Sequence, residues 1–196
     1  METIRTFVAV PLPAPIIRGL ERTQGRLADQ VPPRSVRWVT TSGIHLTLKF
    51  IGDTPASHIS GIDQALSVVA RHAPPCRLTI EGVGCFPDTQ RPRVVWIGVR
   101  EPSGRLAALQ ASIEEALEPL GYKPERRGFT PHLTLGRVNQ RMGRGIASQI
   151  GDAVERADIG VLGQVECDGF ALIQSVLKPT GAVYTTLASY TLEGTP

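Results

Sequence analysis

A short motif that can perform acid–base chemistry occurs twice in this chain. The sequence His-Leu-Thr-Leu begins at His45, in the first half of the 196 residues, and again at His132, in the second half. Alternate side chains of a β-strand share a face. Each copy therefore predicts a strand with its histidine and its threonine, Thr47 or Thr134, on one face and two leucines on the other. We expect the leucines to pack on a core, and the two strands to bring both imidazoles to one cleft.

Two histidines on either side of a phosphodiester can divide the proton transfers of an in-line displacement, because imidazole titrates near neutral pH. One takes a proton from water, and the other gives a proton to the departing oxygen. The hydroxyls of Thr47 and Thr134 can donate hydrogen bonds to the non-bridging oxygens, where negative charge must be held in the transition state. We expect no metal site, because no third carboxylate, thiol or imidazole stands at a matching offset.

The composition is that of an ordinary globular protein, with 41% hydrophobic and 20% charged residues. A formal charge of +3 is compatible with an anionic substrate but does not decide the partner. Cys76, Cys85 and Cys167 form no Cys-x-x-Cys motif, which favours a reducing compartment. We find no signal peptide and no apolar run of about 18 residues. We therefore expect a cytoplasmic monomer without a membrane contact.

Hydrophobic periodicity predicts four helices and eight strands. The helices are expected at residues 14–30, 55–72, 103–120 and 139–156, and the strands at 6–10, 36–39, 44–51, 76–85, 93–99, 126–138, 161–175 and 182–192. No linker or low-complexity run divides the chain. We therefore predict one α+β domain over residues 1–196, built of two pseudo-symmetric lobes. Each lobe is expected to be an antiparallel sheet with helices on its outer face, and the catalytic cleft should lie between the sheets.

The paired motifs resemble those of the two-histidine phosphoesterase superfamily. Further blocks are similar to the RNA 2′,3′-cyclic phosphodiesterases, also called 2′-5′ RNA ligase-like proteins. These blocks follow one another in the right order along nearly the whole chain. They cover residues 5–10, 12–13, 36–39, 45–52, 84–87, 92–96, 127–137, 175–177 and 181–184.

The resemblance implies hydrolysis of a terminal 2′,3′-cyclic phosphate on RNA, tRNA fragments included, to leave a 2′-phosphate. It implies no metal or nucleotide cofactor, and a reverse reaction that joins RNA ends through a 2′-5′ linkage. It assigns His45 as the proton donor to the 3′-oxygen and His132 as the proton acceptor that activates water. Microscopic reversibility exchanges these roles in ligation. Thr47 and Thr134 would hold the phosphate.

Three further residues are candidates for substrate binding. The resemblance implies that Arg137 contacts phosphate. Alternation places it on the face opposite to the second histidine, so the strand must twist or end there for this contact, and the alternative is an arginine that faces solvent. Lys49 shares the face of the first histidine and can add positive potential to the cleft, or lie solvated at the end of its strand. Phe129 can stack on a base of single-stranded RNA or pack in the core, and packing is expected of Phe7.

Two other functions remain open on the sequence. A phosphodiesterase acting on small cyclic nucleotides, or on a cyclic phosphate of an ADP-ribose derivative, would share the catalytic residues and differ in the walls of the cleft. A module that binds a nucleotide or an RNA end without turnover is the alternative from another class. The intact histidines weigh against that module, and His45→Ala distinguishes it, since a binding module has no turnover to lose.

Overall fold

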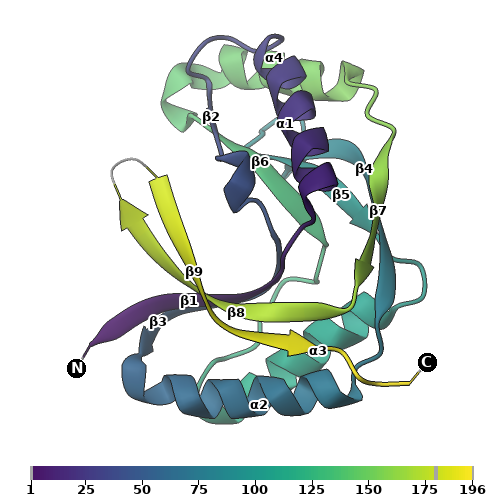
Figure 1. Cartoon of the computed structure of the whole chain (residues 1–196). Coiled ribbons are helices and arrows are strands. Elements are labelled where there is room, and N and C mark those ends of the chain that lie inside the picture. The colour runs from purple at the N-terminus through teal and green to yellow at the C-terminus, as the bar shows by residue number, and fades with distance from the viewer. Residues whose placement is uncertain (1, 179–180, 196) are drawn as a thin grey trace.

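The computed structural model describes residues 2–178 and 181–195, which form two antiparallel sheets with helices packed against them (Figure 1). Sheet A has the strand order β3-β1-β8-β9, and sheet B has the order β2-β6-β5-β4-β7. The strands of sheet A are β1 (Thr3–Val10), β3 (Leu46–Pro55), β8 (Gly169–Lys178) and β9 (Gly181–Thr191). The strands of sheet B are β2 (Val36–Trp38), β4 (Cys76–Phe86), β5 (Val94–Arg100), β6 (His132–Val138) and β7 (Val161–Cys167).

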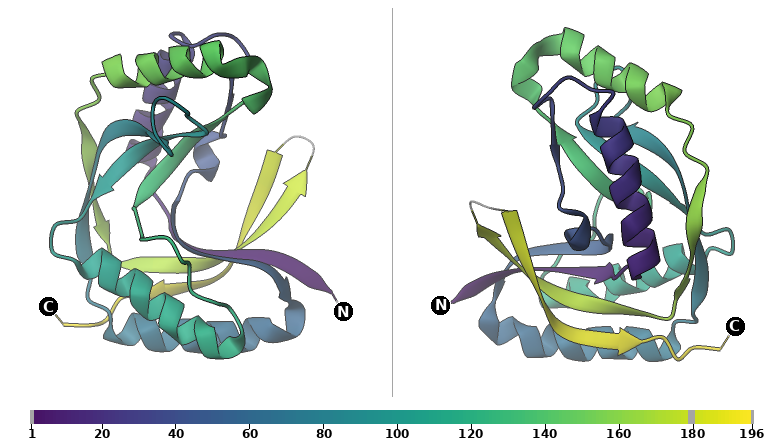
Figure 2. Two further views of the ribbon diagram at one scale, coloured as in Figure 1. Left: turned by 180° about the vertical axis from the view of Figure 1, so that it is seen from behind. Right: turned by 45° about the horizontal axis from the view of Figure 1, so that its top comes forward.

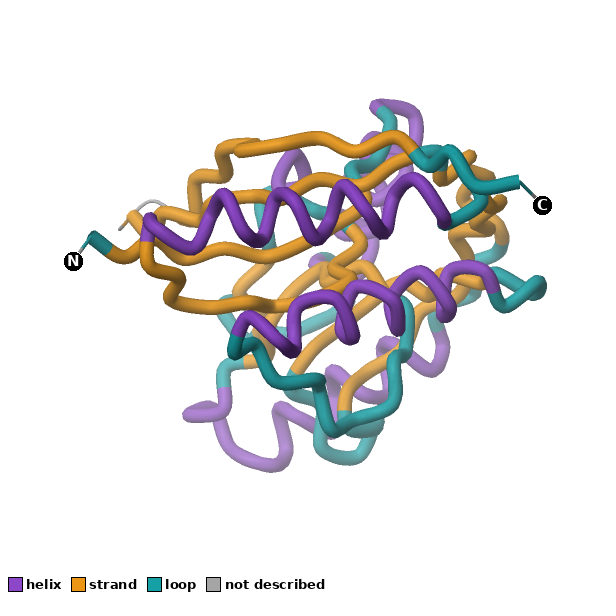
Figure 3. The backbone as a smooth tube through the Cα atoms, turned by 90° about the horizontal axis from the view of Figure 1, so that it is seen from below, coloured by secondary structure: helices purple, strands orange, loops and turns teal. Residues whose placement is uncertain are grey.

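Two helices cover the outer face of each sheet. The helices are α1 (Ala14–Ala28), α2 (Ile59–His72), α3 (Arg105–Leu117) and α4 (Gly143–Arg156). Helices α1 and α4 pack on sheet B, whereas α2 and α3 lie side by side on sheet A (Figures 2 and 3). Short 3-10 turns occur at η1 (Thr41–Gly43), η2 (Ala56–His58), η3 (Glu118–Leu120) and η4 (Gln140–Met142). The predicted α+β architecture of two sheets with outer helices is confirmed.

The two halves of the chain exchange elements between the sheets. Strands β1 and β3 of the first half form one sheet with β8 and β9 from the C-terminal end, through the pairing of β1 with β8 (Figure 1). Helix α1 follows the first strand of sheet A but packs on sheet B, and α3 follows a strand of sheet B but contacts sheet A. Each lobe, a sheet with its two outer helices, therefore contains elements from both halves of the chain. The two pseudo-symmetric units are interleaved, and one half of the chain does not contain all the elements of a lobe.

The strand predicted over residues 161–175 is wrong in one respect, because the structure has two strands there. Strand β7 ends at Cys167 in sheet B, and β8 begins at Gly169 in sheet A. The carbonyl of Asp168 accepts a hydrogen bond from the backbone N–H of Leu192 (2.8 Å). A Cβ at Gly169 would lie 2.5 Å from the carbonyl oxygen of Tyr190, so only glycine fits there. The Asp-Gly pair is the turn signal in the sequence.

The leucines of both motifs are buried in the same hydrophobic cluster. Leu46, Leu48, Leu133 and Leu135 are at most 3% exposed, and this cluster extends through both sheets and all four α-helices. The histidine and threonine of each motif are half-buried. The predicted alternation is therefore confirmed, and each sheet has a motif face, defined as the face opposite to these leucines.

Candidate active site

Both imidazoles are held in the same way by the backbone. His45 Nδ1 donates a hydrogen bond to the carbonyl oxygen of Gly43 (2.9 Å), and His132 Nδ1 donates to that of Thr130 (2.8 Å). Each acceptor lies two residues before its histidine. A carbonyl oxygen can only accept, so Nδ1 carries the hydrogen in both rings. Nε2 of each ring is the nitrogen left to exchange protons with a substrate.

The two motif strands lie next to each other although they belong to different sheets. Strand β3 of sheet A and strand β6 of sheet B are in contact, while the helices occupy the opposite faces of their sheets. The contact between β3 and β6 thus brings together the two copies of the motif, which lie in distant parts of the sequence. This arrangement is what acid–base chemistry from two sides of one group requires.

A β-bulge follows the threonine in the first motif. Val8 of β1 is opposite Lys49, and the next residue, Ala9, is opposite Thr47. Leu48 is therefore an extra residue on β3 without a partner on β1. A bulge of this kind interrupts the alternation of side chains and bends the strand.

The second motif has the same irregularity at the same place. Val95 of β5 is opposite Gly136, and the next residue, Trp96, is opposite Thr134. Leu135 is the extra residue on β6. The fourth residue of each motif is thus bulged, and the faces of Lys49 and Phe50 on β3, and of the residues after Leu135 on β6, are exchanged relative to simple alternation.

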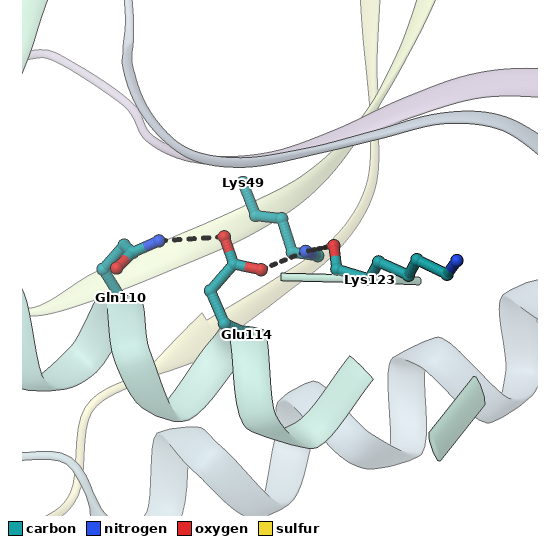
Figure 4. A network of polar contacts seen from close by, with 4 residues as sticks. All are labelled: Lys49, Gln110, Glu114 and Lys123. Carbon is teal, nitrogen blue, oxygen red and sulfur yellow. Dashed lines mark hydrogen bonds and ion pairs between the residues drawn. The ribbon is translucent and has the colours of Figure 1, made fainter. Parts of the chain in front are cut away.

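The first bulge turns Lys49 away from the motif face. The prediction that Lys49 lies on the same face as His45 is therefore wrong. Lys49 is buried, and its ammonium group forms an ion pair with Glu114 of α3 on the outer side of sheet A (Figure 4). It also donates to the carbonyl oxygen of Lys123 (3.0 Å), and Gln110 donates to the other oxygen of Glu114 (2.9 Å). The Lys49 charge is neutralised by this pair, so we assign it no substrate contact.

The second bulge turns Arg137 onto the motif face of sheet B. Gly136 and Val138 are buried on the core side, whereas Arg137 between them is exposed. Its cross-strand partner on β2 is Arg37, which is also exposed. Like charges directly opposite each other destabilise a sheet unless an anion lies between them. Simple alternation would place Arg137 on the face opposite to His132, but the bulge brings both side chains to the same face. A phosphate contact by Arg137 is therefore compatible with the fold of the strand.

Aromatic rings surround His45 on the motif face of sheet A. Phe7, which is 2% exposed, stacks on the imidazole with a centroid distance of 4.5 Å. Tyr184 of β9 meets it edge-on at 5.3 Å. Gly43 makes room for this tyrosine, since a Cβ there would lie 2.9 Å from Tyr184 Cε2. Phe50 follows the bulge and is 64% exposed, with its ring 6.1 Å from that of Phe7.

His132 has one aromatic neighbour among the residues that the structure describes. Phe86 contacts it edge-on, with a centroid distance of 4.8 Å, and tilts against Trp96 at 5.1 Å. Phe129 is half-buried and packs against the large hydrophobic cluster. This placement favours the packing alternative for Phe129. The packing expected of Phe7 is observed, and its contact with the catalytic candidate His45 was not foreseen.

Burial changes the acidity of His45. Loss of water around the ring lowers its pKa from the ordinary value of 6.5, and the hydrogen bond to Gly43 opposes part of this effect. A lower pKa makes the imidazolium a stronger acid and leaves less of it protonated in the free protein. An anionic phosphate next to the ring would raise the pKa again.

Metal ligands and membrane-spanning helices are the two remaining features that bear on binding. Residues 2–178 and 181–195 contain no cluster of three or more His, Cys, Asp or Glu side chains able to hold a metal ion. Within those same ranges, no helix has the length and apolarity needed to cross a bilayer.

Solved structures with the same fold cover nearly the whole chain. The crystal structure of TT0787 of Thermus thermophilus has a TM-score of 0.79 at 28% identity, and covers 97% of this chain and 99% of that one. The crystal structure of E. coli LigT complexed with 3'-AMP has a TM-score of 0.72 at 30% identity, with 97% and 99% covered. The class defined by fold and site is thus that of the LigT-like two-histidine phosphoesterases.

The sequence comparison identifies the family. Residues 17–175 match the 2'-5' RNA ligase superfamily. A protein named RNA 2',3'-cyclic phosphodiesterase in Archaeoglobus fulgidus is 34% identical over 184 residues, which cover 94% of this chain and 98% of the relative. The chain belongs to the 2'-5' RNA ligase superfamily, as the resemblance of its motifs and flanking blocks predicts.

Three residues of the site were missed by reasoning from the sequence. Arg37 is recognisable only through its pairing with β6, and Tyr184 lies in the last strand, far from either motif in the sequence. Phe86 stands before a proline in a predicted turn, which gave no sign of a contact with a histidine. Each depends on which strands become neighbours, which local sequence patterns do not specify.

Proposed function

We propose that this protein hydrolyses the terminal 2′,3′-cyclic phosphate of RNA to a 2′-phosphomonoester, using His45 and His132 as an acid–base pair. The observation that carries the proposal is the matched anchoring of the two imidazoles through Nδ1 on contacting strands, where neither Nε2 has a hydrogen-bond partner among the described residues. The family and the name of the Archaeoglobus relative support RNA as the substrate.

The proposed reaction is an in-line displacement at phosphorus in a cleft between the motif faces. Nε2 of neutral His132 takes a proton from water as the water oxygen bonds to phosphorus. The bond from phosphorus to the 3′-oxygen breaks, and Nε2–H of protonated His45 donates the proton that makes the 3′-hydroxyl. The phosphate remains on the 2′-oxygen. The lowered pKa of His45 suits a proton donor, because the imidazolium is the stronger acid.

The negative charge of the transition state would be held by hydroxyl and guanidinium groups. Thr47 and Thr134 lie on the same faces as their histidines and can donate hydrogen bonds to the non-bridging oxygens. Arg137, with Arg37 opposite it, can neutralise the phosphate, which would also relieve the repulsion between the two arginines. These groups supply charge stabilisation without a metal, so we propose a metal-independent reaction that is reversible to 2′-5′ ligation.

Product analysis of a short RNA with a 2′,3′-cyclic phosphate end, in excess EDTA, tests this function. We expect a 2′-phosphate product, and its loss in His45→Ala and in His132→Ala, since each variant lacks one proton carrier. His72→Ala is the matched control, because His72 lies on α2, away from both motifs, and its ring bonds to the backbone carbonyl of Val68 in its own helix. Loss of activity in EDTA and its return with a divalent ion would contradict the metal-free mechanism.

The same assay separates the other functions. Turnover of 2′,3′-cyclic mononucleotides or ADP-ribose cyclic phosphate without turnover of RNA would identify a small-molecule phosphodiesterase. Binding of the RNA end with no turnover of either substrate would identify a binding module.

A further inference from the structure

A pocket of about 500 Å³ lies outside the pair of histidines. It is bounded by the loop before β5, the end of β6 and the first turn of α4. Its lining includes Arg91, Arg93 and Arg144, together with Asn139 and Gln140, and neither catalytic candidate is part of it. The pocket is therefore a separate place on sheet B, beyond the end of the second motif strand.

The side chains that line this pocket carry positive charge, and no acidic side chain in the lining neutralises it. Arg91, Arg93 and Arg144 take part in none of the ion pairs found within residues 2–178 and 181–195, and no carboxylate of those residues lines the pocket. Asp88 accepts a hydrogen bond from the backbone N–H of Arg91 (2.7 Å), not from its guanidinium. Guanidinium groups are the side chains best suited to phosphate, because their fork of donors matches its oxygens.

The walls of the pocket are held in place by contacts between the loop and α4. Gly151 lacks the Cβ that would collide with the carbonyl of Thr89, so the helix can approach the loop closely. The hydroxyl of Thr89 donates a hydrogen bond to Glu155 of the same helix. Gln140 donates to the carbonyls of Pro92 and Val138, at 3.2 Å each. The arginines therefore project from a fixed frame.

The sequence around the pocket concentrates positive charge. Residues 126–151 contain five arginines and no aspartate or glutamate. One of the five, Arg137, is exposed on the motif face of sheet B between the second histidine and the pocket, and its cross-strand partner Arg37 adds one more exposed arginine there. The result is a cationic path that starts at the candidate active site and ends at the pocket.

We infer that this pocket binds a backbone phosphate of the RNA strand several nucleotides away from the reacting end. The inference rests on the proposed function and deepens it, because it makes the substrate an RNA chain and not a mononucleotide. A strand rises about 3.3 Å per residue, so the end of β6 lies about 20 Å from His132. A cyclic mononucleotide in the active site does not reach that far, whereas an oligonucleotide does.

The double variant Arg93→Gln/Arg144→Gln tests the inference with two substrates. One is a 2′,3′-cyclic mononucleotide, and the other is a ten-nucleotide RNA with a 2′,3′-cyclic phosphate end. We expect the KM of the long RNA to rise about tenfold, while kcat on both substrates and the KM of the mononucleotide stay unchanged. The slope of log KM against log salt should fall by about 0.7 for the long RNA, from one lost phosphate contact.

Arg71→Gln is the control, since it removes an arginine charge, one where the double variant removes two, from α2 on the outer side of sheet A. The inference is overturned if the double variant and this control change the KM of the long RNA equally, or if both substrates lose affinity in the double variant to the same extent. Equal wild-type KM values for short and long substrates would also overturn it. Absence of wild-type turnover on both substrates would instead contradict the proposed function, which keeps the two failures distinct.

Discussion

At the scale of single residues, the two candidate catalytic histidines share their anchoring and differ in their surroundings. Both donate from Nδ1 to the carbonyl two residues before them. His45 lies between Phe7 and Tyr184, whereas His132 contacts Phe86 at its edge. Different environments around two chemically identical groups are a usual way to separate an acid from a base. The roles of donor for His45 and acceptor for His132 stay predictions.

The burial of His45 leads to a prediction about pH dependence. We expect a bell-shaped profile of kcat/KM for cyclic-phosphate hydrolysis, because one imidazole must be protonated and the other neutral. The lower of the two pKa values governs the acidic limb, whichever histidine plays which role. Since the pKa of His45 is below 6.5, that limb should also lie below pH 6.5.

The profile of kcat should have its acidic limb at higher pH than that of kcat/KM, because the bound phosphate anion favours the imidazolium. Initial rates measured at low and at saturating substrate across the pH range give both profiles. A rate that rises steadily from acid to alkaline pH would contradict the two-histidine mechanism.

At the scale of secondary-structure elements, the bulge after each threonine determines which charged side chain meets the substrate. It directs Arg137 to the motif face and Lys49 into the ion pair with Glu114. Residues three positions after the threonines, Phe50 and Arg137, are therefore equivalent in the two units. The motif face of sheet A presents aromatic rings there, and that of sheet B presents guanidinium groups, so the two sides of the site are chemically different.

The buried ion pair between β3 and α3 predicts an asymmetry in stability. Lys49→Ala should lower the free energy of unfolding by about 3–5 kcal/mol, because it leaves the Glu114 carboxylate buried without its partner. The double variant Lys49→Met/Glu114→Leu should be less destabilised than the single variant, since neither charge remains. Denaturant unfolding measures both.

Arg77→Ala is the control for this prediction. It breaks the ion pair with Glu166, in which both side chains are more than 60% exposed, and should cost about 1 kcal/mol or less. If the double variant were as unstable as Lys49→Ala, the unpaired carboxylate would not be the cause.

At the scale of the whole molecule, the last strand of the chain supports a histidine near the beginning. Tyr184 of β9 packs on Gly43, whose carbonyl oxygen holds the His45 ring, and it meets that ring edge-on. The large hydrophobic cluster passes through both sheets, which supports the prediction that residues 1–196 form a single bilobal domain. The site thus depends on interleaving of the two halves.

Gly43→Ala tests this long-range support. The new Cβ would displace the Tyr184 ring, and with it the position of His45, while most of the fold stays untouched. We expect kcat to fall by about tenfold to 100-fold with little change in melting temperature, because small misplacements of a reacting group are costly in rate. Tyr184→Phe keeps the ring and should retain activity. A Gly43→Ala variant with full activity would show that the tyrosine contact does not position His45.

The sequence by itself determined the class of fold, the two histidine–threonine faces and the buried leucines. These follow from alternation and hydrophobic periodicity, which are local properties of the chain, and the repeat of the motif made the pairing of the faces a reasonable expectation. The sequence also indicated most elements within a few residues. Its reading of residues 161–175 as one strand missed an Asp-Gly turn.

Only the tertiary structure decided where Lys49 and Arg137 point, and which rings contact the histidines. Alternation along one strand predicts a side chain's face only while the neighbouring strand keeps the same register. The bulges at Leu48 and Leu135 exist because β1 and β5 pair with the motif strands in a shifted register, and those partners lie far away in sequence. The arginine-lined pocket has the same origin, since residues 90–93 and residues 138–147, which are far apart in the sequence, meet to form it.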